Sequence, residues 1–263
     1  MDPTKLAVGA GTAVLIAGGG YGVSTLFKGG MPDYFSLAAQ TNKYTTDFPD
    51  YFVDIDHKDS SSWWTWVYNT RYWVGSDGKT IEEEARPAPK KAFENLKDAE
   101  GIKGACKKVY EADKAKVKSD NNPTNNDEFA EVDVWRYCTA IKKKPKTIQE
   151  QTGESYSTSG TYGQADPTKL ISVESPDNTS FWKEQQRLFF KGGGNRSGSS
   201  LKNNSAFQDL YEGWKSGKSV KDDALKKTCK DAYGQPTTSS QNPNKYPEAD
   251  VFRYCSLKRT KTS

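Results

Sequence analysis

The sequence predicts an all-α protein, with an N-terminal transmembrane helix followed by two tandem small helical repeats joined by a flexible linker. Three observations support this fold class. An uncharged stretch lies near the N-terminus, and the rest of the chain is written twice. Within each copy, apolar residues recur at intervals of three and four, with no alternation typical of strands.

The repeat is clearest around the four cysteines. The sequence CKKVY at 106–110 precedes DVWRYCT at 133–139, and CKDAY at 229–233 precedes DVFRYCS at 250–256. The two blocks agree in order, direction and residue type. Each copy is therefore expected to be a folding unit with its own pair of cysteines.

Length and composition fit two small domains. A chain of 263 residues has room for two domains of about 100 residues each. Aliphatic residues are scarce, but 14 Tyr, 11 Phe and 7 Trp supply large rings for burial. A net charge of +4 indicates neither disorder nor specific nucleic-acid binding. The predicted division is 1–28 membrane anchor or signal segment, 29–49 juxtamembrane segment, 50–144 repeat 1, 145–176 flexible linker and 177–263 repeat 2.

The stretch from Leu6 to Phe27 contains no charged residue and is long enough to span a hydrocarbon core of about 30 Å as a helix. Three interpretations compete: an uncleaved anchor, a cleaved secretory signal and a glycine-rich phosphate loop. The phosphate loop is disfavoured because no Lys-Ser or Lys-Thr follows the glycines at 18–22. The anchor is favoured, with the C-terminal domains outside the cell.

In the first repeat, Trp63, Trp66 and Trp73 fall at helical spacing and predict a helix with these rings in the core. Shorter helices are expected around Phe93, around Cys106 and at the end of the repeat. The second repeat has the same order, with Phe181 and Trp182 in the first helix. The linker is predicted from its Thr, Ser, Gly and Gln content, and the lysine run at 142–146 is interpreted as solvated.

The duplication favours the disulfides Cys106–Cys138 and Cys229–Cys255, because an ancestral single repeat had only its own pair. Loops of this size imply about 3–4 kcal/mol of stabilisation for each bond. Buried free thiols remain an alternative. A metal site is disfavoured, since no two cysteines stand in a Cys-x-x-Cys pair.

No catalytic motif is present in the sequence, and the prediction is a non-enzymatic protein without cofactor or metal. His57 is the single histidine and has no counterpart in the second repeat, so a surface position is favoured over a general base. Trp64 and Tyr68 are the candidate partner-binding aromatics. Rings on nearly all sides of one helix cannot all be buried by one neighbouring helix.

The Gly/Ala-rich segment from Thr4 to Gly22, with WRYCT at 135–139 echoed at 252–256, resembles the paralogous, uncharacterised membrane-anchored surface proteins of hemotropic mycoplasmas. The resemblance implies a surface-exposed protein of a wall-less bacterium, with a role in host contact or antigenic variation. It brings no catalytic residue.

Together these observations predict a surface protein held in the membrane through Leu6 to Phe27, whose repeats contact a host surface protein or glycan. The alternative is an intracellular, membrane-associated scaffold with reduced cysteines that binds another protein.

Overall fold

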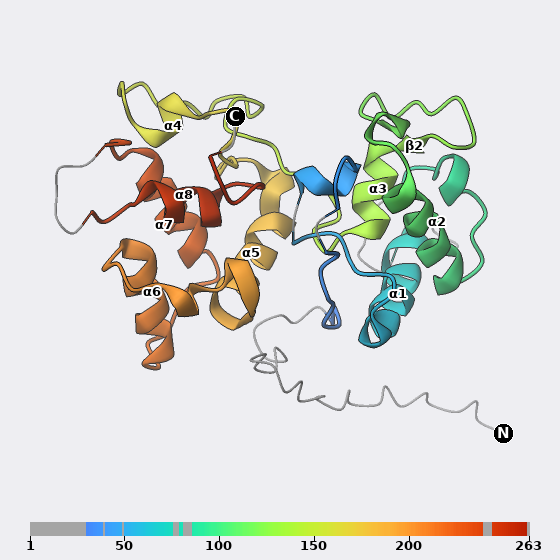
Figure 1. Cartoon of the computed structure of the whole chain (residues 1–263), viewed down its shortest axis with the longest axis horizontal. Coiled ribbons are helices and arrows are strands. Elements are labelled where there is room, and N and C mark those ends of the chain that lie inside the picture. Colours follow the sequence, from blue (N-terminus) through green and yellow to red (C-terminus); the bar gives the residue numbers. More distant parts are fainter. Residues whose placement is uncertain are drawn as a thin grey trace.

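The computed structural model describes residues 30–38, 40–48, 50–75, 79–80, 86–238 and 244–261. These residues form two helical units, a first unit up to residue 144 and a second unit from residue 145 (Figure 1). The first unit contains α1 (Ser61–Val67), α2 (Ala99–Glu111), β1 (Val117–Lys118), β2 (Phe129–Ala130) and α3 (Glu131–Cys138). The second contains α4 (Tyr162–Ala165), α5 (Thr179–Lys191), α6 (Ala206–Lys215), α7 (Ala224–Tyr233) and α8 (Glu248–Cys255). The two strands pair in parallel over two residues.

The predicted fold class was right about helices but wrong in its layout. No helix among the described residues combines the length and the apolar character needed to cross a bilayer. The stretch from Leu6 to Phe27, which was expected to form the anchor, lies outside the described residues.

The prediction of a flexible linker at 145–176 was also wrong. Ile148, Tyr162, Leu170 and Ile171 are buried in it, and α4 packs on α7. Its scattered apolar residues are enough to hold it in the fold, since Leu170 pairs with Ser256 and the amide of Ile171 donates to the carbonyl of Cys255 at the end of α8. The segment that we had assigned as juxtamembrane is likewise part of the fold, since Tyr44 is buried.

The two units repeat the same hydrogen-bond pattern. In the second unit, the segment 145–176 supplies part of that pattern. The amide of Val53 donates to the carbonyl of Cys138 (3.1 Å), as that of Ile171 donates to Cys255 (2.9 Å). The Tyr110 hydroxyl contacts the carbonyls of Val53 and Cys138, and the Tyr233 hydroxyl contacts those of Ile171 and Cys255. The extended segments before α1 and α5 are therefore equivalent, and the repeat is longer than the sequence suggested.

Local sequence sets where several helices begin. The Asp98 carboxylate accepts a hydrogen bond from the amide of Gly101 (2.8 Å) at the start of α2. The Ser205 hydroxyl does the same for the amide of Gln208 at the start of α6. Such N-caps satisfy amides that have no partner inside the helix.

The units meet through polar contacts made by the first described segment, which lies between them in Figure 1. The Tyr51 hydroxyl donates to Oε1 of Gln185 (2.8 Å), and the Asp50 carboxylate pairs with Nε of Arg196 (2.9 Å). The Tyr51 ring also packs against Phe181, with centroids 5.7 Å apart. Because both partners of each polar contact are largely buried, the contacts fix how the units dock.

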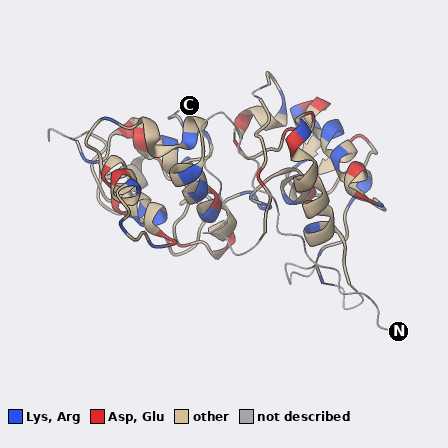
Figure 2. Ribbon diagram, turned by 90° about the horizontal axis from the view of Figure 1, so that it is seen from below, with Lys and Arg blue, Asp and Glu red and all other residues tan. Residues whose placement is uncertain are grey.

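Charges of both signs are spread over both units (Figure 2). The lysine run at 142–146 is not simply solvated. Lys146 pairs with Asp177 (2.9 Å) and Lys144 pairs with Glu131 (3.0 Å), so the run bridges the end of the first unit and the start of the second.

Candidate functional site

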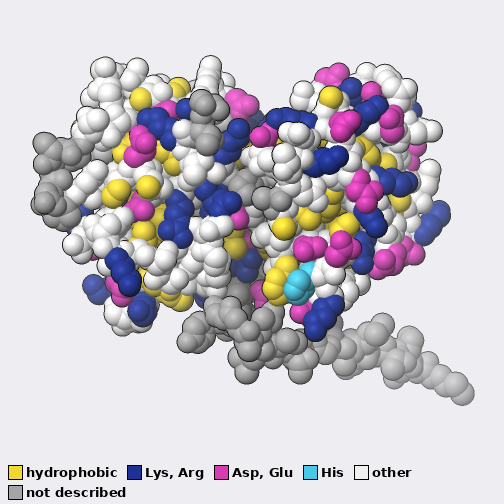
Figure 3. Space-filling view, in the orientation of Figure 1, with side chains coloured by type: hydrophobic (Ala, Val, Ile, Leu, Met, Phe, Trp, Pro, Cys, Tyr) yellow, Lys and Arg dark blue, Asp and Glu magenta, His cyan; other side chains and the backbone are white. Residues whose placement is uncertain are grey.

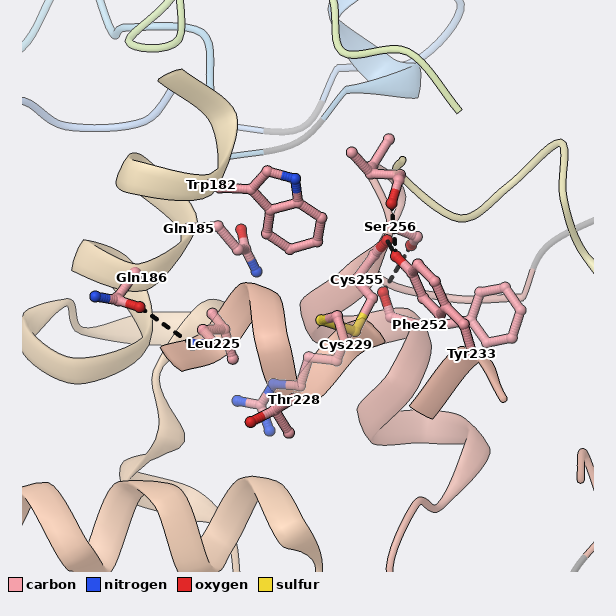
Figure 4. The surroundings of a disulfide bond; sticks show 12 residues. Trp182, Gln185, Gln186, Leu225, Thr228, Cys229, Tyr233, Phe252, Cys255 and Ser256 are labelled. Carbon is pink, nitrogen blue, oxygen red and sulfur yellow. Dashed lines mark hydrogen bonds between the residues drawn. A yellow bond between two sulfur atoms is a disulfide. The ribbon is translucent and has the colours of Figure 1, made fainter. Parts of the chain in front are cut away.

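The predicted disulfides are confirmed, with Cys106 bonded to Cys138 and Cys229 bonded to Cys255. All four cysteines are completely buried. Figure 4 shows the second bond between α7 and α8, with Trp182, Leu225, Phe252 and Tyr233 around it. No free cysteine is present. A disulfide without solvent access is a structural bond, because an attacking thiolate needs access to a sulfur atom.

In each unit a buried arginine holds the end of the last helix. Arg71 donates from Nη1 to the carbonyl of Thr139 (2.8 Å) and from Nη2 to that of Ala140 (3.1 Å). Arg196 donates in the same way to Ser256 (2.7 Å) and Leu257 (2.6 Å). These carbonyls follow the helix and have no partner within it, so the guanidinium both satisfies them and complements the negative end of the helix dipole.

A carboxyl group on the last helix of the first unit is buried as well. Oδ2 of Asp133 accepts a hydrogen bond from the amide of Lys90 (2.8 Å). Burial raises the pKa of Asp133 to about 6, because removal from water disfavours the charged form. This group ties the chain before α2 to α3.

His57 has a structural position. Its Nδ1 accepts a hydrogen bond from the amide of Asp59 at the start of a 3₁₀ turn. Its ring stacks on Phe35, with centroids 3.5 Å apart. In the space-filling view the histidine lies at the surface of the first unit beside hydrophobic atoms (Figure 3).

Within the described ranges, no three His, Cys, Asp or Glu residues are arranged to hold a metal ion. A groove of about 240 Å³ lies at the junction of the units, lined by Glu131, Trp135, Lys143, Lys144 and Asp177 among others. Its lysines are already paired with its carboxylates, so its charges are largely compensated.

The tryptophans that are buried and the one that is exposed around the first helix are not those that the sequence predicted. Trp63 is in the core as expected, but Trp64 is only 1% exposed, so the prediction that it binds a partner was wrong. The two rings meet edge to face at 4.7 Å, and both lie in the core. Trp73, which was expected in the core, is 51% exposed.

We define the outer aromatic face as Trp66, Tyr68 and Trp73. Trp66 is half-buried under the guanidinium of Arg71, with its centroid 4.6 Å from Cζ. Tyr68, the other predicted partner-binding ring, is half-buried and stacks on Tyr72 at 5.6 Å. Trp73 follows directly on the helix, and among the described residues it is the one large apolar side chain that is mostly exposed.

Sequence reasoning missed both Trp73 and the arginines. A signal for Trp73 was present, since the chain between Phe93 and Cys106 is nine residues shorter than that between Phe207 and Cys229. In the second unit the corresponding longer stretch carries Trp214, which packs on Phe190. The arginines gave no signal, because they do not occupy equivalent positions in the two repeats.

The fold and the site define a class: a two-unit, disulfide-clipped helical protein with an exposed aromatic face. No protein-family model matches the chain, and no curated protein or solved structure is significantly similar to it.

Proposed function

We propose that the protein is exported and acts without catalysis, binding a partner on the host-cell surface through the outer aromatic face. Two buried disulfides support the export, because such bonds persist in oxidising compartments and are rare in the cytosol. They also count against the alternative of an intracellular scaffold with reduced cysteines.

The observation that carries the proposal is the exposure of Trp73. The half-exposed indole of Trp73 offers a large, rigid contact area at a low cost in conformational entropy. The chain buries its other tryptophans wholly or partly, so this one stands outside the needs of the core.

The test is binding of the fluorescently labelled full chain to host cells. Trp73→Ala is expected to reduce the bound fraction at least tenfold, and Trp73→Phe to restore part of it. Trp214→Ala, a half-buried tryptophan in the second unit, is the matched control and is expected to bind as the parent protein does. Equal binding by the parent and Trp73→Ala would contradict the role of the face.

The compartment is tested separately. Alkylation of freshly lysed source cells is expected to leave all four cysteines unmodified, since each is held in a disulfide. Free thiols at these positions would contradict export and favour the reduced intracellular scaffold.

A further inference from the structure

We infer that the outer aromatic face receives a helix of the partner protein, one that carries an aromatic ring in the position that Trp214 has on α6. This inference rests on the proposed function and specifies the chemistry of the partner. It comes from comparing what covers the equivalent surface in the second unit.

The helix that leads to Trp73 corresponds to α5. Trp63 and Trp64 form an edge-to-face pair, as Phe181 and Trp182 do. The first helix then passes through a π-helical turn, Tyr68–Tyr72, which inserts one residue.

After this insertion, Tyr72 corresponds to Phe189. Their contacts agree, since Tyr72 packs against Tyr137 of α3 at 5.4 Å and Phe189 against Tyr254 of α8 at 4.9 Å. The next residue in each chain is Trp73 and Phe190. Phe190 is 3% exposed, whereas Trp73 is 51% exposed.

Helix α6 accounts for this difference. Its Trp214 packs on Phe190, with centroids 5.3 Å apart, and its Tyr211 packs edge to face on Phe189 at 5.9 Å. Tyr211 and Trp214 are three residues apart and therefore lie on one face of the helix. Two rings one turn apart thus cover this surface in the second unit.

The first unit has a counterpart of Phe207, the residue near the start of α6, but its described chain then continues to α2 without a helix like α6. Phe93 packs on Tyr137 at 5.4 Å as Phe207 packs on Tyr254 at 5.2 Å, so the two phenylalanines are equivalent. Phe93 ends a three-residue 3₁₀ turn, and α2 begins at Ala99. Residues 94–98, all of them described, contain no helical turns corresponding to those that carry Tyr211 and Trp214.

The geometry therefore specifies the occupant. A helix that places rings as α6 does would cover Trp73 as Trp214 covers Phe190, burying apolar area and gaining edge-to-face aromatic contacts. This is recognition of an amphipathic helix through a ring in the position of Trp214, since Tyr72, the counterpart of Phe189, is already buried under Tyr68 and Arg86.

The experiment titrates the full chain with a helix-stabilised peptide of the α6 sequence, residues 205–217, labelled for fluorescence anisotropy. We expect saturable binding that weakens at least tenfold with Trp73→Ala. The control peptide with alanine in place of Tyr211 and Trp214 is expected to bind at least tenfold more weakly than the parent peptide. The parent peptide is also expected to compete with host cells for the labelled protein.

Two outcomes would overturn the inference: no saturable binding of the parent peptide, or equal binding by the parent chain and Trp73→Ala. Failure of the proposed function is a different result, the absence of host-cell binding by the parent chain. If cells bind and the peptide does not, the face recognises another chemistry and the helix inference alone is lost.

Discussion

The two units provide hydrogen-bond donors to the end of their last helix from different places in the chain. Each must satisfy the carbonyls that follow its last helix, and each does so with a buried guanidinium. Arg71 reaches them from within the π-helical turn, whereas Arg196 reaches them from a 3₁₀ turn beyond the end of α5. The requirement therefore belongs to the backbone, and any segment that can deliver the donors meets it.

The difference also has a consequence for docking. Arg196 stacks over the Tyr51 ring at 5.2 Å and pairs with Asp50, both from the first unit. Arg71 instead stacks on Trp66 of its own unit. The second arginine thus couples the end of α8 to the contact between units, and the first acts locally.

The largest effect is expected from Arg196→Met. It removes the donors to Ser256 and Leu257 and leaves the Asp50 carboxylate without this partner, so the free energy of unfolding should fall by about 4 kcal/mol. Arg71→Met should cost less, because it breaks no contact between the units. Urea denaturation of both variants measures the difference, and a larger loss for Arg71→Met would contradict this assignment.

Next come the disulfides, where the two units should behave alike. The bonds join residues 32 and 26 positions apart, so the chain-entropy model gives each about 3.5 kcal/mol. The double variants Cys106→Ala/Cys138→Ala and Cys229→Ala/Cys255→Ala should lose similar amounts in urea denaturation. A much larger loss for one pair would show that packing around that bond outweighs loop closure.

A smaller effect is expected from pH, and it comes from Asp133. Its pKa of about 6 in the folded protein is above the value near 4 of an unfolded chain, so the folded state binds the proton more tightly. The free energy of unfolding should therefore fall by about 2 kcal/mol as pH rises from 4 to 6, and this contribution should level off above about pH 7.

Asp133→Asn should remove that slope in urea denaturation at a series of pH values. Asp250→Asn changes the equivalent residue of the second unit and serves as the control, since it keeps Asp133. A slope that survives in Asp133→Asn would assign it to other groups.

The sequence predicted those features that the duplication repeats. The pairing of Cys106 with Cys138 followed from it, as did the helices that end in Arg-Tyr-Cys. It failed where a short-range pattern had to stand for long-range packing. The polar composition of 145–176 suggested a linker, although buried Tyr162 and Ile171 anchor that segment. Helical spacing placed Trp73 in the core, but a π-helical turn inserts one residue before it, and no helix in the described part of the first unit covers it as α6 covers Phe190.

One further contrast lies at the start of the first helix of each unit. In the second unit, the Asn178 amide donates to the carbonyls of Lys146 and Ser172, both at 2.8 Å, and its oxygen accepts from the amide of Lys146. The Trp182 indole also donates to the carbonyl of Ser172 (3.0 Å). In the first unit, the equivalent Ser60 hydroxyl is buried and has no hydrogen-bond partner among the described residues.

The smallest predicted effect is a gain in stability from Ser60→Asn. Phe35 and Asp54 are joined by a backbone hydrogen bond of 2.7 Å, as Lys146 and Ser172 are at 3.0 Å, so the acceptors for an asparagine at position 60 are already in place. The new amide should raise the free energy of unfolding by about 1 kcal/mol in urea denaturation. Ser60→Ala is the control and should be nearly neutral, because the hydroxyl that it removes has no partner. A loss of stability in Ser60→Asn would mean that the two helix starts differ in backbone spacing as well as in side chain.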